Sequence, residues 1–215
     1  LNKTSAIDLY ERMFLIRLTE ETIAARYAEG QMRCPTHLSI GQESVPSILR
    51  AFITDDDYAV STHRGHAHYL AKGGNLFAMI AEIYGKETGC SKGKGGSMHM
   101  FSREKKFFGG HGIVGAQVPI GVGLAFSHKY KDEPNVCLTY LGDGAVNQGQ
   151  VYESFNMAAL WSLPCLFIIE NNQYGMGTAV TRAAAGSDLA DRGMAYGIPG
   201  KQDDGMDVLA VLNAA

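Results

Sequence analysis

Length, composition and charge narrow the class of protein before any motif is considered. The chain has 215 residues, of which 46% are hydrophobic and 19% charged, with a formal net charge of −3 at pH 7. Such a chain predicts a globular protein with a buried core. The slightly acidic balance argues against nucleic-acid binding, which depends on neutralising phosphates. We expect no membrane association, because no run of about 18 apolar residues is present.

The cysteines indicate a reducing compartment. Cys34, Cys90, Cys137 and Cys165 lack the CxxC spacing of zinc and redox motifs. Two of them fall inside predicted strands, where cysteine behaves as a small hydrophobic residue. We therefore expect reduced thiols and a cytoplasmic location. The mitochondrial matrix is the alternative, because the chain begins at Leu1 rather than Met, as it would if a targeting segment had been removed.

The first third of the chain is predicted to form helices and one short strand. Ser5 is a plausible N-cap for a first helix that Gly30 terminates. Four apolar residues recur on one face of this helix, which predicts packing: Ile7, Tyr10, Phe14 and Leu18. The pattern then predicts a helix over about 43–52, a strand over 58–61 and a helix over about 76–84.

A basic segment follows the predicted strand. Arg64 stands at the strand end, where its planar guanidinium can engage two phosphate oxygens at once. A surface ion pair is the alternative for this arginine. The neighbouring His63, His66 and His68 suggest zinc, but their spacing completes no closed set of four ligands, so we do not favour a zinc site.

Two glycine-rich segments resemble nucleotide-binding motifs without matching them. The loop 85–100 lacks the GxxxxGK[ST] pattern of a P-loop, because Thr88 occupies the first glycine position and Gly95 the Ser/Thr position. The run 110–115 does match GxGxxG, but the charged residues before it show no alternation, so we expect no preceding strand and do not favour NAD binding. We expect these glycines to expose backbone beside a ligand, and the small residues at 115–125 to form a closely packed helix.

The stretch from Gly142 to Asn172 has the pattern of a βαβ unit. Apolar runs at 136–141 and 166–170 predict strands, and residues 150–160 predict the helix between them. Parallel strands end at the same edge of a sheet, so Asp143 and Asn172 are expected to lie close together. Their oxygens suit Mg²⁺, which usually shares its shell with ligand phosphates. The sequence therefore predicts an α/β fold with a metal-diphosphate site.

The last part of the chain is expected to be less regular. Residues 173–207 read as a polar loop and 207–215 as the start of a helix. We expect one domain spanning 1–215, with an N-terminal helical segment, that lacks its C-terminal part, because a doubly wound sheet normally continues with a further strand after such a helix.

These motifs together resemble the α subunit of thiamine diphosphate-dependent 2-oxo acid dehydrogenases, the E1 component of pyruvate and acetoin dehydrogenases. The resemblance covers nearly the whole chain and is most specific at Gly142-Asp143-Gly144 with Asn171-Asn172, at 94–100 and at 112–117. It implies the thiamine diphosphate-binding fold of the PP type, a doubly wound, mostly parallel sheet with helices on both faces.

The resemblance also implies roles for particular residues. Asp143, Asn172 and the backbone carbonyl of Tyr174 would hold Mg²⁺. The remaining cofactor contacts would come from His63, Arg64, Ser102, Gly112, Val114, Gly144 and Ala145. His37 would lie near the substrate. His63 and His111 are the candidates for catalysis, His111 because it adjoins the cofactor segment.

The implied activity is oxidative decarboxylation of a 2-oxo acid, with pyruvate as the favoured substrate, and acyl transfer to lipoyl groups of an E2 component. In this family an essential glutamate comes from a separate β subunit, so we expect an α2β2 assembly. Residues 98–117 look pyruvate-like, whereas 61–66 look more like acetoin-type subunits, and a branched-chain substrate is a further alternative. The alternative from another class is a catalytically silent interaction subunit.

Overall fold

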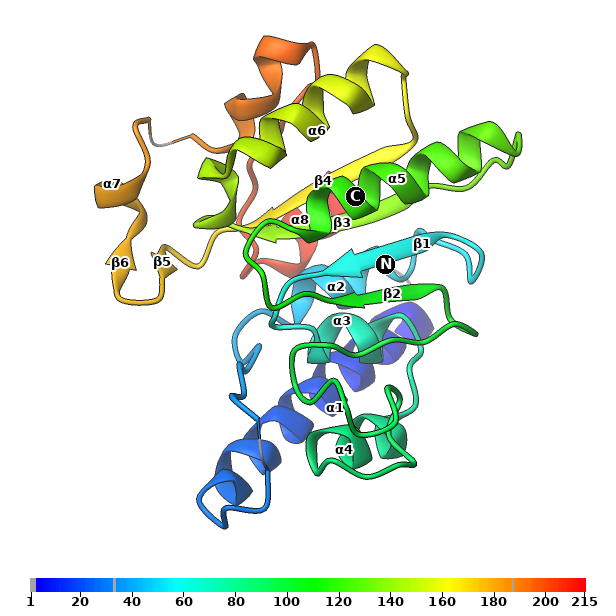
Figure 1. Ribbon diagram of the computed structural model, residues 1–215, viewed down its shortest axis with the longest axis vertical. Helices are drawn as coiled ribbons and strands as arrows, with labels where there is room; N and C mark the ends of the chain where they lie inside the picture. Colours follow the sequence, from blue (N-terminus) through cyan, green and yellow to red (C-terminus); the bar gives the residue numbers. More distant parts are fainter. Residues whose placement is uncertain (1–2, 33, 187) are drawn as a thin grey trace. The chain divides into compact units, whose positions relative to one another are not determined.

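The computed structural model describes residues 3–32, 34–186 and 188–215. The chain forms two compact units (Figure 1). Unit 1 comprises residues 1–55, 63–110 and 203–215, and unit 2 comprises 56–62 and 111–202. The single-domain organisation expected from the sequence stays a prediction, and each unit is described by itself.

Unit 2 is built on parallel strands connected by helices. Strand β3 lies between β1 and β4, and both pairs are parallel, with Tyr58 opposite Cys137 and Gly142 opposite Glu170. The elements of this unit are β1 (Tyr58–Ser61), α5 (Gln117–Tyr130), β3 (Cys137–Gly142), the 3₁₀ turn η1 (Ala145–Asn147), α6 (Gly149–Leu160), β4 (Cys165–Glu170), β5 (Tyr174–Gly175), β6 (Thr178–Ala179), α7 (Val180–Ala183) and the 3₁₀ helix η2 (Ala190–Tyr196). This confirms the predicted α/β fold class.

Small and apolar side chains bring the two helices onto the sheet. A Cβ atom on Gly121 of α5 would lie 2.0 Å from Thr139 Oγ1, so only glycine allows this helix to approach β3 so closely. Helix α6 lies beside α5 on the same side of the sheet (Figure 1). Its Val151 and Phe155 share a core cluster with Leu141 of β3. The predicted βαβ unit is therefore present, with boundaries shifted by one residue.

Unit 1 consists mainly of helices and a long glycine-rich loop. Its elements are α1 (Lys3–Tyr27), α2 (Ser44–Leu49), α3 (His66–Ala71), α4 (Leu76–Ile83), β2 (Phe107–Gly110) and α8 (Val208–Ala214). The side chain of Asp207 caps α8 by accepting the N–H groups of Leu209 and Ala210. This confirms the predicted C-terminal helix, and the predicted helices over 43–52 and 76–84 are also present in shorter form.

A buried carboxylate organises the loop between α4 and β2. Glu82 is fully buried and accepts four backbone N–H groups: those of Ser91 at 2.7 Å, Gly93 at 2.9 Å, Gly95 at 2.6 Å and Gly96 at 3.1 Å. Glycine is required beside it, because a Cβ on Gly89 would lie 2.3 Å from Glu82 Oε2. The loop is thus a fixed structure wrapped around one charge rather than a phosphate-binding motif.

The predicted packing face of the first helix was wrong. Ile7, Tyr10, Phe14 and Leu18 are between 45% and 66% exposed. The buried face of α1 instead carries Ile16, Thr19, Glu20 and Ile23, a mixture of apolar and polar side chains. Ser5 lies inside the helix rather than at its N-cap, and the helix ends at Tyr27, three residues before Gly30. Because this face includes polar residues, the periodicity of apolar residues did not identify it.

Other expectations also needed correction. Strand β2 ends at Gly110, so a strand does precede the GxGxxG run, and the argument against NAD binding from a missing strand was wrong. Phe107 and Phe108 form it despite the charged residues before them. Helix α3, which begins at His66, was not predicted. The expected polar loop 173–207 contains the β5–β6 hairpin, α7 and η2.

Across the described residues, no helix combines the length and hydropathy needed to cross a membrane.

Candidate functional site

Asp143 lies directly beyond the end of β3. It is 3% exposed, although it carries a carboxylate. Burial raises the pKa of Asp143, while hydrogen bonds from the backbone N–H groups of Asp143 and Gly144 oppose the shift. A buried carboxylate of this kind gains from a nearby cation, because the cation offsets the charge that burial makes costly.

Asn172 follows the neighbouring strand β4. Because Gly142 is opposite Glu170, Asp143 and Asn172 both stand at the carboxyl edge of the β3–β4 pair. The Oδ1 atom of Asn172 accepts the N–H of Tyr174 at 3.1 Å, and this bond turns the chain into the β5–β6 hairpin. A carboxamide oxygen has two acceptor positions, so this bond leaves Asn172 the capacity to ligate a cation.

The hairpin returns to the turn after β3. A Cβ atom on Gly144 would lie 3.6 Å from the Cα of Gly175, so the Asp143 turn and the Tyr174–Gly175 strand are adjacent. Ala145 begins η1, and its side chain belongs to the core cluster of unit 2. Only its backbone is therefore suited to contact a ligand. The structure thus gathers Asp143, Gly144, Asn172 and Tyr174 at one edge of the sheet.

This donor set fits a hard cation. Asp143 supplies a carboxylate, Asn172 a carboxamide oxygen and Tyr174 a backbone carbonyl, which are the ligand types of Mg²⁺. Within the described ranges, no cluster of three or more His, Cys, Asp or Glu side chains is arranged to share a metal ion. The sheet edge therefore offers oxygen donors rather than the imidazole and thiolate donors of zinc.

The segment before α5 also belongs to unit 2. Val114 is exposed and its carbonyl accepts from Gln150 Nε2 at 3.3 Å, which ties the segment to the start of α6. Gly112 is half-buried, as is His111. Gly115 adopts φ +83°, and a Cβ there would lie 2.9 Å from Gln150 Nε2, so glycine is required in this turn.

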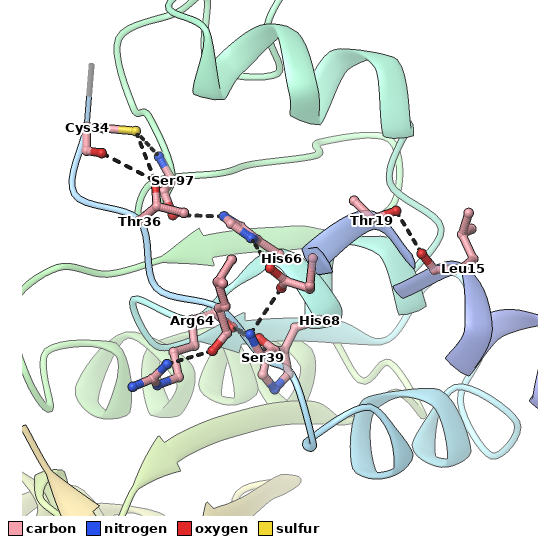
Figure 2. Close-up of polar contacts among 11 residues, drawn as sticks. Leu15, Thr19, Cys34, Thr36, Ser39, Arg64, His66, His68 and Ser97 are labelled. Atoms are coloured by element: carbon pink, nitrogen blue, oxygen red, sulfur yellow. Dashed lines mark hydrogen bonds and ion pairs between the residues drawn. The ribbon is translucent and has the colours of Figure 1, made fainter. Parts of the chain in front are cut away.

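Three basic residues named from the sequence gather in unit 1. The rings of His37 and His63 meet edge to face with centroids 4.6 Å apart. Arg64 Nη1 donates to the carbonyl of Leu38 at 2.6 Å, which places the guanidinium beside the His37 segment. Figure 2 shows Arg64 close to Ser39, whose hydroxyl donates to the Arg64 carbonyl at 3.2 Å.

Both imidazoles of this cluster are held neutral. Burial lowers the pKa of His63 to about 4, with the nearby His37 and Arg64 acting in the same direction. Burial also lowers the pKa of His37, again with Arg64 contributing. An anion bound here would reverse the electrostatic part of these shifts.

Ser102 has a structural role in unit 1. It forms a bridge with Phe107 through two backbone hydrogen bonds, of 2.9 and 3.0 Å, and its hydroxyl accepts the N–H of Lys105 at 3.3 Å. Its predicted contact with a cofactor stays a prediction.

Sequence reasoning missed several buried polar residues. Glu20, His66 and Ser97 form a connected group inside unit 1, and Gln117 donates to the Tyr140 carbonyl inside unit 2. Glu20 in α1 and Gln117 in α5 interrupt the apolar pattern of their helices, and that interruption could have marked them as buried polar residues. Their hydrogen-bond partners could not be found from sequence.

A groove of about 490 Å³ in unit 2 lies away from these residues. It is lined by Phe126, Lys129, Tyr130, Leu160, Trp161, Ser162 and Leu163. These residues lie in the C-terminal half of α5, at the C-terminal end of α6 and in the turn before β4, so the groove is at the opposite end of the sheet from Asp143. None of the residues named from the sequence lines it.

The fold and the site define an α/β protein with oxygen donors at the carboxyl edge of parallel strands, the usual place for ligands in such sheets. Residues 11–215 match the family model described as dehydrogenase E1 component. The chain therefore belongs to the dehydrogenase E1 component family.

Relatives in this family are close in sequence. The chain is 53% identical over 214 residues to the pyruvate dehydrogenase E1 component subunit alpha of Rhizobium meliloti, covering 100% of this chain and 62% of that protein. It is 53% identical over 205 residues to the corresponding protein of Rickettsia conorii, covering 95% and 63%. The mitochondrial subunit of Dictyostelium discoideum is 49% identical, covering 99% and 55%. The chain thus spans less than two thirds of the length of these relatives.

Among solved structures, one match is a proposed thiamin diphosphate-dependent enzyme from Mycobacterium smegmatis. It is 18% identical, with a TM-score of 0.49, and covers 72% of this chain and 25% of that one. This similarity is too weak to add to the assignment.

Proposed function

We propose that this chain is the cofactor-binding part of an E1 α subunit that acts in the oxidative decarboxylation of pyruvate. The family match over residues 11–215 and the 53% identity to pyruvate dehydrogenase α subunits support this proposal. The single structural observation that carries it is the buried carboxylate of Asp143, which stands with Asn172 at the edge of β3 and β4.

Mg²⁺ is the proposed metal, with Asp143, Asn172 and the carbonyl of Tyr174 as its ligands from this chain. When bound, the diphosphate of thiamine diphosphate would supply further oxygen ligands to the metal. Gly144 and Ala145 then offer backbone to the phosphate oxygens, since Gly144 carries no side chain and the Ala145 side chain points into the core.

Further contacts with the cofactor are proposed from the resemblance to E1 α subunits. Gly112 and Val114 contact the ring of the cofactor, and His111 is a candidate for proton transfer. His63 and Arg64 contact the diphosphate, with Ser102 lining the cofactor. His37 faces the substrate.

The chemistry divides between cofactor and protein. When bound, thiamine diphosphate supplies the electron sink that decarboxylation of a 2-oxo acid requires. The residues of this chain bind and orient it. Asp143 balances the cation, and Arg64 places a fixed positive charge at the phosphates. The neutral imidazoles of His37 and His63 can donate one hydrogen bond each without adding a second full charge.

The proposed partners are an E1 β subunit in an α2β2 assembly and the lipoyl groups of an E2 component, which accept the acyl group. All four cysteines are free thiols, in keeping with a cytoplasmic or mitochondrial matrix location.

Acetoin or a branched-chain 2-oxo acid is the second candidate substrate. The segment Ser61-Thr62-His63-Arg64-Gly65-His66 favours acetoin, because it resembles acetoin-type subunits, and His63 stands where many pyruvate-type subunits carry Tyr.

A steady-state assay with a dye acceptor separates these candidates. The complete α subunit, reconstituted with its β subunit, is given pyruvate, acetoin or 2-oxoisovalerate. We expect the highest kcat/KM for pyruvate and no turnover when the β subunit is omitted. A preference for acetoin would replace the proposed substrate, and robust turnover without the β subunit would overturn the proposed assembly. Absence of thiamine diphosphate binding would favour a silent interaction subunit.

A further inference from the structure

Three polar side chains inside unit 1 form a continuous hydrogen-bonded chain. Glu20 on α1 bonds through Oε2 to His66 Nδ1 at 3.1 Å, and His66 Nε2 bonds to Ser97 Oγ at 2.8 Å. All three are fully buried, with exposed fractions of 0%. Figure 2 shows His66 between Ser97 and the α1 helix. These hydrogen bonds therefore connect α1, the start of α3 and the glycine-rich loop.

The donors and acceptors in this chain can be assigned from its partners. A carboxylate oxygen accepts, and an imidazole that donates from Nδ1 to Glu20 can accept at Nε2 from the Ser97 hydroxyl. We adopt this arrangement of donors and acceptors. The order Ser–His–Glu is that of a hydrolytic nucleophile, but the complete burial of Ser97 leaves no route for a substrate. The geometry is suited to holding structure rather than to attacking a ligand.

The same carboxylate fixes the segment that carries the basic cluster. Glu20 Oε1 accepts the backbone N–H of Ser39 at 3.2 Å. Ser39 Oγ donates to the carbonyl of Arg64 at 3.2 Å, and Arg64 Nη1 donates to the carbonyl of Leu38 at 2.6 Å. One hydrogen bond thus links Glu20 to Ser39, and a second links Ser39 to Arg64.

Ser97, at the other end of this series of hydrogen bonds, is also anchored. The N–H of Ser97 donates to Cys34 Sγ at 3.3 Å. The loop just before Ser97 is held by Glu82, which accepts the N–H groups of Gly95 and Gly96. Ser97 is therefore a fixed end point and not a mobile loop residue.

We propose that Glu20, His66 and Ser97 are positioning residues that set the orientation of Arg64, and with it the affinity for the diphosphate group. The inference rests on the proposed function for the role of Arg64. It rests on the hydrogen-bonded chain alone for the coupling of Ser97 to the 38–39 segment. The three residues act through Arg64 and do not touch the ligand.

Ser97→Ala is the mildest test, because it removes one hydroxyl and leaves His66 Nε2 without that donor. Glu20→Gln is the conservative variant, since the amide can accept from Ser39 while donating to the other tautomer of His66. Thr19→Val is the matched control. Thr19 is buried next to Glu20, but its hydroxyl donates at 2.7 Å to the Leu15 carbonyl of the same helix (Figure 2).

The measurements are calorimetric titration with thiamine diphosphate and Mg²⁺, kcat at saturating cofactor, and amide exchange of Ser39, all on the complete subunit with its β partner. Ser97→Ala is expected to raise the cofactor Kd about tenfold and speed Ser39 exchange, with kcat at saturation changing less than twofold. Glu20→Gln should fall between it and the wild type, and Thr19→Val should match the wild type.

Equal Kd values for Ser97→Ala and Thr19→Val would overturn the proposed positioning role. A wild-type protein that fails to bind the cofactor would contradict the proposed function instead. The coupling is then judged by Ser39 exchange alone, where equal rates in Ser97→Ala and Thr19→Val would overturn it and a faster rate in Ser97→Ala would support it.

Discussion

Asp143 and His63 are shifted toward their uncharged forms for the same physical reason. Burial is the largest cause at both residues, raising the pKa of Asp143 and lowering that of His63. In the proposed complex Mg²⁺ would offset the charge of Asp143, and the diphosphate would accept a hydrogen bond from His63. Side chains that are costly to charge in the free protein are those whose charge a ligand would stabilise.

The shift of His63 predicts how stability depends on pH. The ordinary pKa is 6.5 and the folded value is about 4, so the unfolded chain binds a proton in this range that the folded chain does not. The free energy of unfolding should therefore fall as pH drops from about 6.5 to about 4. Replacing His63 with Gln should reduce the loss of Tm between pH 7 and pH 5. An identical loss of Tm in the variant would show that His63 does not titrate in this way.

Residue types and spacing predicted that Asp143 and Asn172 follow neighbouring parallel strands, because strand ends are readable from sequence. Their role as metal ligands stays a prediction. The network of Glu20, His66 and Ser97 was not readable. Its members are separated by 46 and 31 residues along the chain, and only the fold brings them together.

At the scale of elements, continuous apolar runs predicted β3 and β4, of which β3 is buried and β4 half-buried. The segment between them was correctly predicted as the helix α6. The same criterion misplaced the buried face of α1, which includes Thr19 and Glu20. It also missed β2, where two phenylalanines follow a charged segment. Periodicity fails where a buried polar network replaces apolar packing.

The role of Glu82 in holding the glycine-rich loop can be tested by substitution. In Glu82→Gln, the amide nitrogen replaces one of two oxygens that each accept two backbone N–H groups. At least two buried donors lose their acceptor, so unfolding should become easier by about 3 kcal/mol. The amides of Ser91 to Ser97 should exchange faster.

Glu87→Gln is the matched control, because Glu87 is exposed on the same loop. We expect it to leave denaturant unfolding unchanged. Equal effects of the two substitutions would refute the anchoring role of Glu82.

At the scale of the whole molecule, each unit carries its own part of the proposed cofactor set. Unit 2 holds the oxygen donors around Asp143, and unit 1 holds the basic cluster of His37, His63 and Arg64. Sequence similarity assigned both parts to one function, whereas residue patterns alone gave only a generic metal-diphosphate site. The family match covers both parts of the chain, from residue 11 to residue 215.

The most direct test of the central claim is calorimetric titration of thiamine diphosphate with Mg²⁺ into the reconstituted assembly, comparing the wild type with Asp143→Asn. The substitution keeps the shape of the side chain but removes the charge that balances the cation. We predict at least a 100-fold loss of affinity. Because burial raises the pKa of Asp143, its charge costs stability at neutral pH, and the ligand-free variant should melt no lower than the wild type. Unchanged affinity in Asp143→Asn would contradict the assignment of Asp143 as the metal ligand.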